Sequence, residues 1–336
     1  RSVSAFLLNR SSDLAMGFVM ALTNKEQIIK LCNNINKKEG DGAIYSIGSK
    51  HANLKINRWS TGIEDLDAIV GGGMPEGRTI EIFGPESSGK TTLLYHLMAM
   101  HNLALDIPVE GTFDADRARI FGNRPKQLLV YRAKFGEDAM NKTIHFAKAG
   151  IPIIGIDSVP SLVPKEDAEK VLKSADRDSI EEQRIGGTAR LLNKYLPTIE
   201  EIIEVTGTTV IFVNQVRDKM NALMFGEKTD TPGGRKLKHS CSLRIQVARR
   251  AWIEIPNKDP RNSANTEKVG FIMKCKVVKS KVCNPMGECE IPCFFDRGFV
   301  SFDDVKDIRK ELMRERAERF GKRVPKELSD DDDDED

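Results

Sequence analysis

The stretch GPESSGKT, from Gly84 to Thr91, has the residue types and the spacing of a phosphate-binding loop. In the pattern G-x-x-x-x-G-K-[ST], glycines let backbone N–H groups converge on phosphate oxygens, and the following helix N-terminus adds partial positive charge. The lysine of this pattern, Lys90, reaches the β and γ phosphates, and the hydroxyl of Thr91 can hold Mg²⁺. The nucleotide-binding residues predicted on this basis are Gly84, Pro85, Glu86, Ser87, Ser88, Gly89, Lys90, Thr91 and Thr92.

A second apolar run, IPIIGID at 151–157, ends in Asp157. Enzymes with a phosphate loop hold Mg²⁺ with an additional acidic residue at the end of a buried strand. The run and the loop together therefore predict a nucleoside triphosphate site in which Thr91 and Asp157 are the metal ligands.

Three acidic residues, Glu110, Asp114 and Asp116, crowd the stretch VEGTFDADRARIFG about 20 residues after the loop. A hydrolase needs one carboxylate to activate water. Residue type and spacing leave all three as candidates.

The elements that must position these residues follow from the hydrophobic pattern. TIEIF (79–83) precedes the loop and a helical stretch follows it; further apolar runs lie at 151–157, 208–214, 243–248 and 270–278. Runs that are apolar on both faces and separated by helices predict a mainly parallel twisted sheet flanked by helices, an α/β fold. The later runs follow one another without helices, so we expect an antiparallel extension. Two polar segments within this core, at about 164–187 and 217–236, are interpreted as long functional loops.

The ends of the chain are polar. An apolar stripe at helical spacing in residues 21–38 predicts a small N-terminal helix, and a charged helix is expected after residue 302. The last seven residues are all acidic, and without them the net charge of +2 becomes +9. The domains expected are a leader at 1–19 that is added or disordered, an N-terminal helix and oligomerisation element at 20–56, an ATPase core at 57–302, and a charged helix with an acidic tail at 303–336.

A basic body with an acidic tail is typical of nucleic-acid-binding proteins, because the tail competes with phosphate for the basic surface. No apolar run approaches the roughly 18 residues of a membrane span. The six cysteines are few for a disulfide scaffold, and four of them lack the paired spacing of zinc sites. We therefore expect a cytoplasmic protein with no membrane contact.

Four stretches of the chain closely resemble the bacterial RecA recombinases: GDGAIYSIGS (40–49), STGIEDLDAIVGGGMPEGRTIEIFGPESSGKTTL (60–93), NQVRDKMNALMFGEKTDTPGGRKLK (214–238) and KCKVVKSKVCNP (274–285). The match runs in order from about residue 21 to residue 302. It implies a RecA-type P-loop ATPase core whose subunits form a helical filament on single-stranded DNA, with ATP between neighbouring subunits and double-stranded DNA as the pairing partner.

The resemblance also implies roles for single residues. Lys90, Thr91 and Asp157 would hold ATP and Mg²⁺. Gln215 matches the residue that senses the γ phosphate and passes its presence to the following loop. Lys279 and Lys281 match a pair that reaches the ATP of the neighbouring subunit, and residues two apart on a strand do share a face.

The two predicted loops coincide with the DNA-contacting loops of the family. Ile185 and Met220 match apolar residues that wedge between base triplets. The residues that match positions near DNA are Arg190, Arg217, Lys219, Gly233, Gly234 and Arg235. Backbone amides and cations at such positions would bind phosphates without reading sequence.

Aligning ARIFG with its family counterpart places Glu110 on the catalytic glutamate. Asp116 is its rival, but an aspartate carries its carboxylate one methylene closer to the backbone. EGTF followed by an acidic-Arg pair also resembles the archaeal and eukaryotic strand-exchange proteins, which places Arg117 where that branch stacks an arginine on adenine. Asp114 and Asp116 are then interpreted as charges that favour a helix start.

The chain departs from typical bacterial members in four ways. The turn before ALDIPVEG is shorter, Pro108 replaces an acidic residue, the first DNA loop is longer and more charged, and the bacterial C-terminal domain is missing. These differences suggest a phage-encoded or otherwise divergent member, active in a bacterial cell or a phage-infected host. The function expected is DNA-stimulated ATP hydrolysis with homologous pairing and strand exchange. A ring-shaped motor such as a replicative helicase, or a non-catalytic protein that coats single-stranded DNA, are the alternatives.

Overall fold

A mixed β-sheet forms the centre of the chain from residue 57 onward. The computed structural model describes residues 24–40, 43–46, 56–111, 113–173, 180–218, 229–257 and 265–319. The chain divides into two units, residues 1–56 and residues 57–336. In the first unit residues 24–39 are helical, so the predicted N-terminal helix is present, and it exposes the large apolar side chains of Ile28, Ile29 and Leu31.

Nine strands of the described chain pair in the order β13-β12-β11-β10-β3-β7-β6-β4-β5. Their bounds are β3 (Thr79–Gly84), β4 (Ala104–Pro108), β5 (Leu128–Val130), β6 (Ile153–Asp157), β7 (Thr209–Gln215), β10 (Leu243–Pro256), β11 (Thr266–Ser280), β12 (Glu288–Phe294) and β13 (Gly298–Phe299). All pairs from β10 to β5 are parallel, whereas β11, β12 and β13 add antiparallel pairs. The predicted mainly parallel sheet with an antiparallel extension is confirmed.

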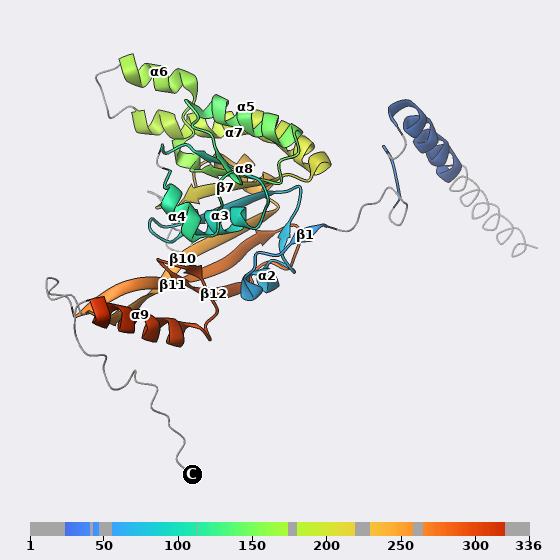
Figure 1. Ribbon diagram of the computed structural model, residues 1–336. Helices are drawn as coiled ribbons and strands as arrows, with labels where there is room; N and C mark the ends of the chain where they lie inside the picture. Colours follow the sequence, from blue (N-terminus) through green and yellow to red (C-terminus); the bar gives the residue numbers. More distant parts are fainter. Residues whose placement is uncertain are drawn as a thin grey trace, which may run out of the picture. The chain divides into compact units, whose positions relative to one another are not determined.

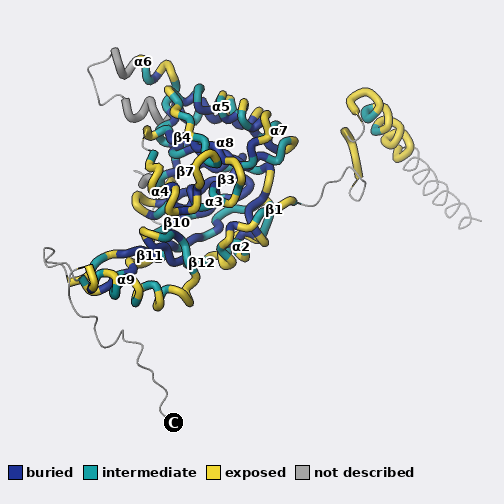
Figure 2. Tube along the Cα trace, viewed as in Figure 1, coloured by how far each residue is buried: buried dark blue, intermediate teal, exposed yellow. Residues whose placement is uncertain are grey.

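Helices cover both faces of the parallel part, which explains why its strands are apolar on both sides. One core cluster joins the sheet to α2 (Glu64–Ile69), α3 (Lys90–Ala99) and α4 (Ala115–Ile120). The other cluster joins it to α5 (Gly136–Lys148), the 3₁₀ turn η1 (Val159–Ser161), α7 (Ile180–Thr206) and α8 (Gly234–Ser240). Figure 1 shows this layering, and Figure 2 shows the buried residues concentrated in the sheet and on the helix faces next to it.

The described part of the chain also contains two short two-stranded sheets. One pairs β1 (Arg58–Trp59) with β2 (Met74–Pro75), and the other pairs β8 (Arg217–Asp218) with β9 (Thr229–Asp230). The β8–β9 pair brings the start of the segment predicted as the second loop against residues 229–230 of the same segment.

The long antiparallel hairpin of β10 and β11 has its own helical cover. The charged helix predicted after residue 302 is present as α9 (Val305–Arg319). Its Leu312 is buried against Ile253, Val269 and Phe294. Although α9 is too polar to form a core alone, these contacts attach it to the hairpin.

The segment at 164–187, predicted as an irregular loop, is helical over much of its length. Helix α6 covers Lys165–Lys173, and α7 already includes Ile180. The prediction of a loop was therefore wrong there, because polarity alone cannot distinguish a loop from a solvated helix. The acidic Glu166 and Asp167 in the first turn of α6 are favourable at the positive end of its dipole.

Among the described residues, no helix is both long enough and apolar enough to cross a membrane.

Candidate nucleotide-binding site

The predicted phosphate loop connects β3 to α3, at the carboxyl edge of the parallel strands. Gly89 precedes α3 with a φ of 91°, which glycine adopts without strain. A Cβ atom at Gly84 would overlap the carbonyl oxygen of Val247 on β10. Arg249 of the same strand donates from Nη1 to the carbonyl of Ser87 at 3.1 Å. Close packing on β10 therefore fixes the shape of the loop.

Lys90, the first residue of α3, extends its ammonium group into the loop. Nζ donates to the carbonyl oxygens of Gly84 at 3.1 Å and Pro85 at 2.6 Å. Burial lowers the pKa of Lys90, while the nearby carboxylates of Asp157 and Glu110 act in the opposite direction. The geometry thus holds a cation inside a ring of backbone groups, where phosphate oxygens can compete for it.

The two predicted metal ligands lie in contact. Thr91 Oγ1 donates to Asp157 Oδ2 at 2.6 Å, joining the start of α3 to the end of β6. Burial raises the pKa of Asp157 to about 6, and the neighbouring Glu110 adds to the rise. The buried Ser88 hydroxyl has no hydrogen-bond partner among the described residues. A hard cation and phosphate oxygens would satisfy all three oxygen groups, so the donor set fits Mg²⁺ held by one carboxylate and a hydroxyl together with phosphates.

Glu110 follows β4, which is paired with β6, and its carboxylate lies close enough to Asp157 and Lys90 that its charge acts to raise the pKa of both. Oε1 accepts hydrogen bonds from the Ser158 hydroxyl and, at 3.4 Å, from Nε2 of Gln215 at the end of β7. The backbone N–H of Glu110 donates to the carbonyl of Asp157 at 3.3 Å. The ends of three neighbouring strands, β4, β6 and β7, thereby bring Glu110, Asp157 and Gln215 together.

The other two acids of this stretch lie at the start of α4. Asp114 caps the helix, because its carboxylate accepts from the backbone N–H groups of Asp116 and Arg117 at 3.1 and 2.9 Å. The Asp116 side chain is 87% exposed and pairs with Arg119 at 2.9 Å. The interpretation of both as helix-start charges is confirmed.

A cavity of about 360 Å³ adjoins the loop. It is lined by Ser87, Gly89, Lys90, Thr91, Thr92, Tyr95, Phe113, Asp114 and Arg117. Arg117 donates from Nη2 to the Thr92 hydroxyl at 3.1 Å, so α4 places a guanidinium over the start of α3. The rings of Tyr95 and Phe113 meet edge to face at 6.1 Å between centroids. The volume, the aromatic rings and the cation suit a purine base beside the phosphate loop.

A larger cavity of about 700 Å³ lies elsewhere, between α2, β12 and the start of α9. Its lining includes four acidic residues, Glu64, Asp65, Asp303 and Asp304. This charge would repel a triphosphate, so the smaller cavity is the candidate nucleotide site.

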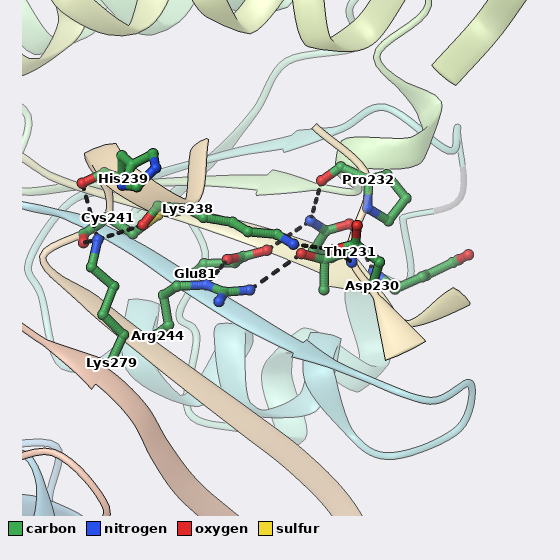
Figure 3. Close-up of polar contacts among 11 residues, drawn as sticks. Glu81, Asp230, Thr231, Pro232, Lys238, His239, Cys241, Arg244 and Lys279 are labelled. Atoms are coloured by element: carbon green, nitrogen blue, oxygen red, sulfur yellow. Dashed lines mark hydrogen bonds and ion pairs between the residues drawn. The ribbon is translucent and has the colours of Figure 1, made fainter. Parts of the chain in front are cut away.

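The predicted lysine pair lies at the end of β11, with Lys279 in the strand and Lys281 directly after it. Lys279 Nζ donates to carbonyl oxygens at the end of α8, those of Lys238, His239 at 3.0 Å and Cys241 at 2.9 Å (Figure 3). Lys281 Nζ approaches the carbonyl of Ser240 at 3.5 Å. Burial and the like charge of Lys281 lower the pKa of Lys279. Within one subunit, both ammonium groups thus bind the negative end of the α8 dipole.

The predicted DNA-binding residues that can be placed lie on α7 and α8. Arg190 of α7 and Arg235 of α8 are exposed. Gly233 and Gly234 open α8 with φ angles of 95° and 73°, and a Cβ on Gly234 would touch Ala189, the neighbour of Arg190. The structure therefore brings the two predicted segments together at the start of α8. Ile185 lies on α7 and Arg217 on β8, but their side chains, like Lys219 and Met220 entirely, lie outside the described residues.

Sequence reasoning missed several residues of the site. Ser158 directly follows Asp157, and a serine after a strand-ending aspartate could have been noted as a partner for a catalytic acid. Tyr95 lies one helical turn after Thr91 and Thr92, a spacing that could have placed it in the same cavity. Asp106 of β4 gave no signal at all. It is buried, neither carboxylate oxygen has a hydrogen-bond partner among the described residues, and burial next to Asp157 raises its pKa to about 8.

The sequence of this chain is similar to those of known proteins. Residues 26–300 match the family described as the RecA N-terminal domain. The protein RecA of Rhodopirellula baltica is 38% identical over 283 residues, which cover 82% of this chain and 70% of the relative. The protein RecA of Campylobacter hominis is 33% identical over 296 residues (86% and 80%), and that of Chlamydia trachomatis is 34% identical over 283 residues (82% and 76%).

Proposed function

This chain belongs to the RecA family, and from that membership we propose that it is a DNA-dependent ATPase that forms helical filaments on single-stranded DNA and promotes homologous pairing and strand exchange. One observation carries the ATPase part of the proposal. The ends of three adjacent strands bring Glu110, Asp157 and Gln215 together beside a phosphate loop. Other enzymes with a phosphate loop have the loop and the aspartate in common with this chain. The Gln215–Glu110 contact goes further, because it connects the site to the segment that follows β7.

In the proposed complex, the phosphate loop and Lys90 bind the phosphates of ATP, and Arg117 with the rings of Tyr95 and Phe113 holds the adenine. Thr91 and Asp157 hold Mg²⁺, which when bound would neutralise charge that develops on the phosphates. The raised pKa of Asp157 supports this assignment, because a cation is what such a desolvated carboxylate lacks.

Glu110 orients the attacking water in the proposed reaction. Ser158 and Gln215 both donate to its Oε1 oxygen, so its position is fixed before the substrate arrives. Lys90 stabilises charge on the transferred phosphoryl group. Catalysis of this kind depends on positioning and electrostatic stabilisation.

Between subunits, we assign Lys279 and Lys281 to the ATP of a neighbour in the filament. Their present partners are neutral carbonyl groups, and a triphosphate is a stronger partner for an ammonium group. DNA would contact the start of α8 at Gly233, Gly234 and Arg235, and Arg190 of α7. Arg217, Lys219, Met220 and Ile185 remain proposed contacts of the same surface. The proposed place of action is the cytoplasm of a bacterial cell or a phage-infected host.

The deciding experiment measures ATP hydrolysis with and without single-stranded oligo(dT), combined with electron microscopy of the complex and a strand-exchange assay. We expect DNA to stimulate steady-state phosphate release, helical filaments with ATP, and a joint product from homologous strands. Hydrolysis that is indifferent to DNA would overturn the proposal. Closed rings in place of filaments would support a motor, and the absence of multiple turnovers would support a coating protein.

A further inference from the structure

A fully buried carboxylate lies in the middle of the sheet. Glu81 belongs to β3, and its side chain is 0% exposed. Its register partner on β10 is Arg244, whose Nε lies 2.5 Å from Glu81 Oε2. The other carboxylate oxygen, Oε1, accepts a hydrogen bond from Nδ2 of Asn214 on β7 at 2.7 Å. A buried charge persists only when its partners satisfy it, and here strands on both sides of β3 supply them.

The same two partners of Glu81 also hold the chain that leads into α8. Arg244 donates from Nη2 to the Thr231 hydroxyl at 3.2 Å (Figure 3). Asn214 Nδ2 donates to the carbonyl of Pro232 at 2.8 Å. Next to them, Lys238 of α8 pairs with Asp230. Thr231 and Pro232 directly precede Gly233 and Gly234, the proposed DNA contacts.

Asn214 connects this anchor to the nucleotide site. Its Oδ1 accepts from the backbone N–H of Gln215 at 2.9 Å, and the Gln215 side chain contacts Glu110. One path of contacts therefore runs from Glu110, the proposed catalytic residue, through Gln215 and Asn214 to Pro232. A second path runs from Glu81 through Arg244 to Thr231. Residues on both sides of the predicted second loop are tied to one carboxylate.

We propose that Glu81 and Arg244, with Asn214, are positioning residues that transmit the nucleotide state of Gln215 to the DNA-binding start of α8. This inference rests on the proposed function. Gln215 is the residue proposed to sense the γ phosphate, and its backbone N–H is bound by the Asn214 side chain that also binds Glu81 and Pro232, so a shift of Gln215 would be passed to both. Arg244 completes the unit, since its planar guanidinium bonds Glu81 and Thr231 while lying 4.6 Å over the Phe83 ring. A rigid polar unit with fixed partners on both sides transmits a displacement that an apolar cluster could absorb.

The test removes one link and keeps the fold. Thr231→Val deletes the hydroxyl that Arg244 binds but leaves the Arg244–Glu81 pair, and Thr231→Ser retains the hydroxyl. Thr209→Val is the matched control, because Thr209 is also buried and its hydroxyl donates to the carbonyl of Pro75, outside this network. All variants are made in the full chain.

The measurement is the affinity for fluorescent oligo(dT) with a non-hydrolysable ATP analogue and without nucleotide. The ratio of the two affinities is the coupling between the sites. We expect Thr231→Val to lower this ratio about fivefold or more, within the usual range of such couplings. Its affinity for the analogue without DNA should stay unchanged, and Thr231→Ser and Thr209→Val should keep the ratio of the unmodified chain.

Two results would overturn the inference. One is an unchanged ratio in Thr231→Val, and the other is an equal loss of DNA affinity with and without nucleotide, which indicates general loosening of α8. If the unmodified chain itself shows no effect of the analogue on DNA affinity, the proposed function fails instead, and the two failures remain distinguishable. Asn214→Ala interrupts the network at a second, independent residue, and we expect the same fall in the ratio of the two DNA affinities.

Discussion

Gln215 Nε2 and Glu110 Oε1 lie 3.4 Å apart, although 105 residues separate them in the chain. The parallel order of β4, β6 and β7 produces this proximity, because parallel strands bring their carboxyl ends to one edge of the sheet. The contact joins the acid proposed to orient water with the residue proposed to sense the γ phosphate. In the proposed mechanism, hydrolysis and the response to DNA therefore share one hydrogen-bonded group.

Glu110→Gln should reduce the steady-state rate of ATP hydrolysis about 100-fold or more, because an amide cannot accept the proton of the attacking water. ATP-dependent binding to oligo(dT) should persist, since the amide keeps the size of the side chain and can bond Ser158. The matched control is Asp116→Asn, which changes an exposed acid of the same stretch and should leave turnover unchanged. Normal turnover in Glu110→Gln together with its loss in Asp116→Asn would transfer the catalytic role.

Arg117→Ala should raise KM for ATP about tenfold with little change in kcat. A cation over a base contributes about 1 to 2 kcal/mol when partly desolvated, and the base is bound equally in the ground and transition states. Arg119→Ala on the same helix is the control, because Arg119 is 62% exposed and forms an ion pair with the exposed Asp116. A fall in kcat at unchanged KM would contradict the assignment of Arg117 to the base.

Lys279→Ala should lower the DNA-stimulated rate of hydrolysis at least about tenfold, since a cation aimed at developing phosphate charge stabilises the transition state. The rate without DNA should change much less, because the proposed filament forms on single-stranded DNA. Lys306→Ala, an exposed lysine of α9, is the control. An unchanged DNA-stimulated rate in Lys279→Ala would remove its assignment to the neighbouring subunit.

Asp106 gives the stability of the protein a predictable dependence on pH. Its pKa is about 8 in the folded chain and about 3.8 in the unfolded one, so the folded chain binds the extra proton between these values. The free energy of unfolding should therefore fall as pH rises from about 4 to about 8, by at most about 1.4 kcal/mol per pH unit.

Asp106→Asn should flatten this slope, because an amide does not titrate. Urea unfolding at pH 5.5 and pH 8 measures it, and the variant should gain stability relative to the unmodified chain at the higher pH. Asp65→Asn, a change at an exposed aspartate, should leave the slope as it is. A slope in Asp106→Asn equal to that of the unmodified chain would show that Asp106 is ionised in the folded state at pH 5.5.

The sheet was predictable from sequence where strands were long and apolar. The runs that became β3, β6 and β7 were identified because burial between two helical layers demands continuous apolar residues. Those that became β10 and β11 were identified from apolar residues that alternate with more polar ones. β4 was missed, since the buried Asp106 and the terminal Pro108 interrupt its pattern. Helix α6 was missed for the opposite reason, because its exposed surface is as polar as a loop.

The site was predictable only where a local motif carried it. Lys90 and Thr91 follow from the phosphate loop, and Asp157 from the end of its strand. The partners of Glu110 depend on strand order, which no local pattern specifies. The Glu81–Arg244 pair was not found for the same reason: an acid inside an apolar run gains a meaning only when a strand more than 160 residues away supplies its register partner.

Strand β10 meets two distant parts of the site through residues five positions apart. Arg244 binds Glu81 beneath α8, and Arg249 binds the carbonyl of Ser87 in the phosphate loop. Five positions span about 16 Å of strand, and an odd spacing points the two side chains to opposite faces. Adding or deleting one residue between them would exchange those faces, whereas many substitutions would not. Among homologues, this stretch should therefore vary in composition far more readily than in length.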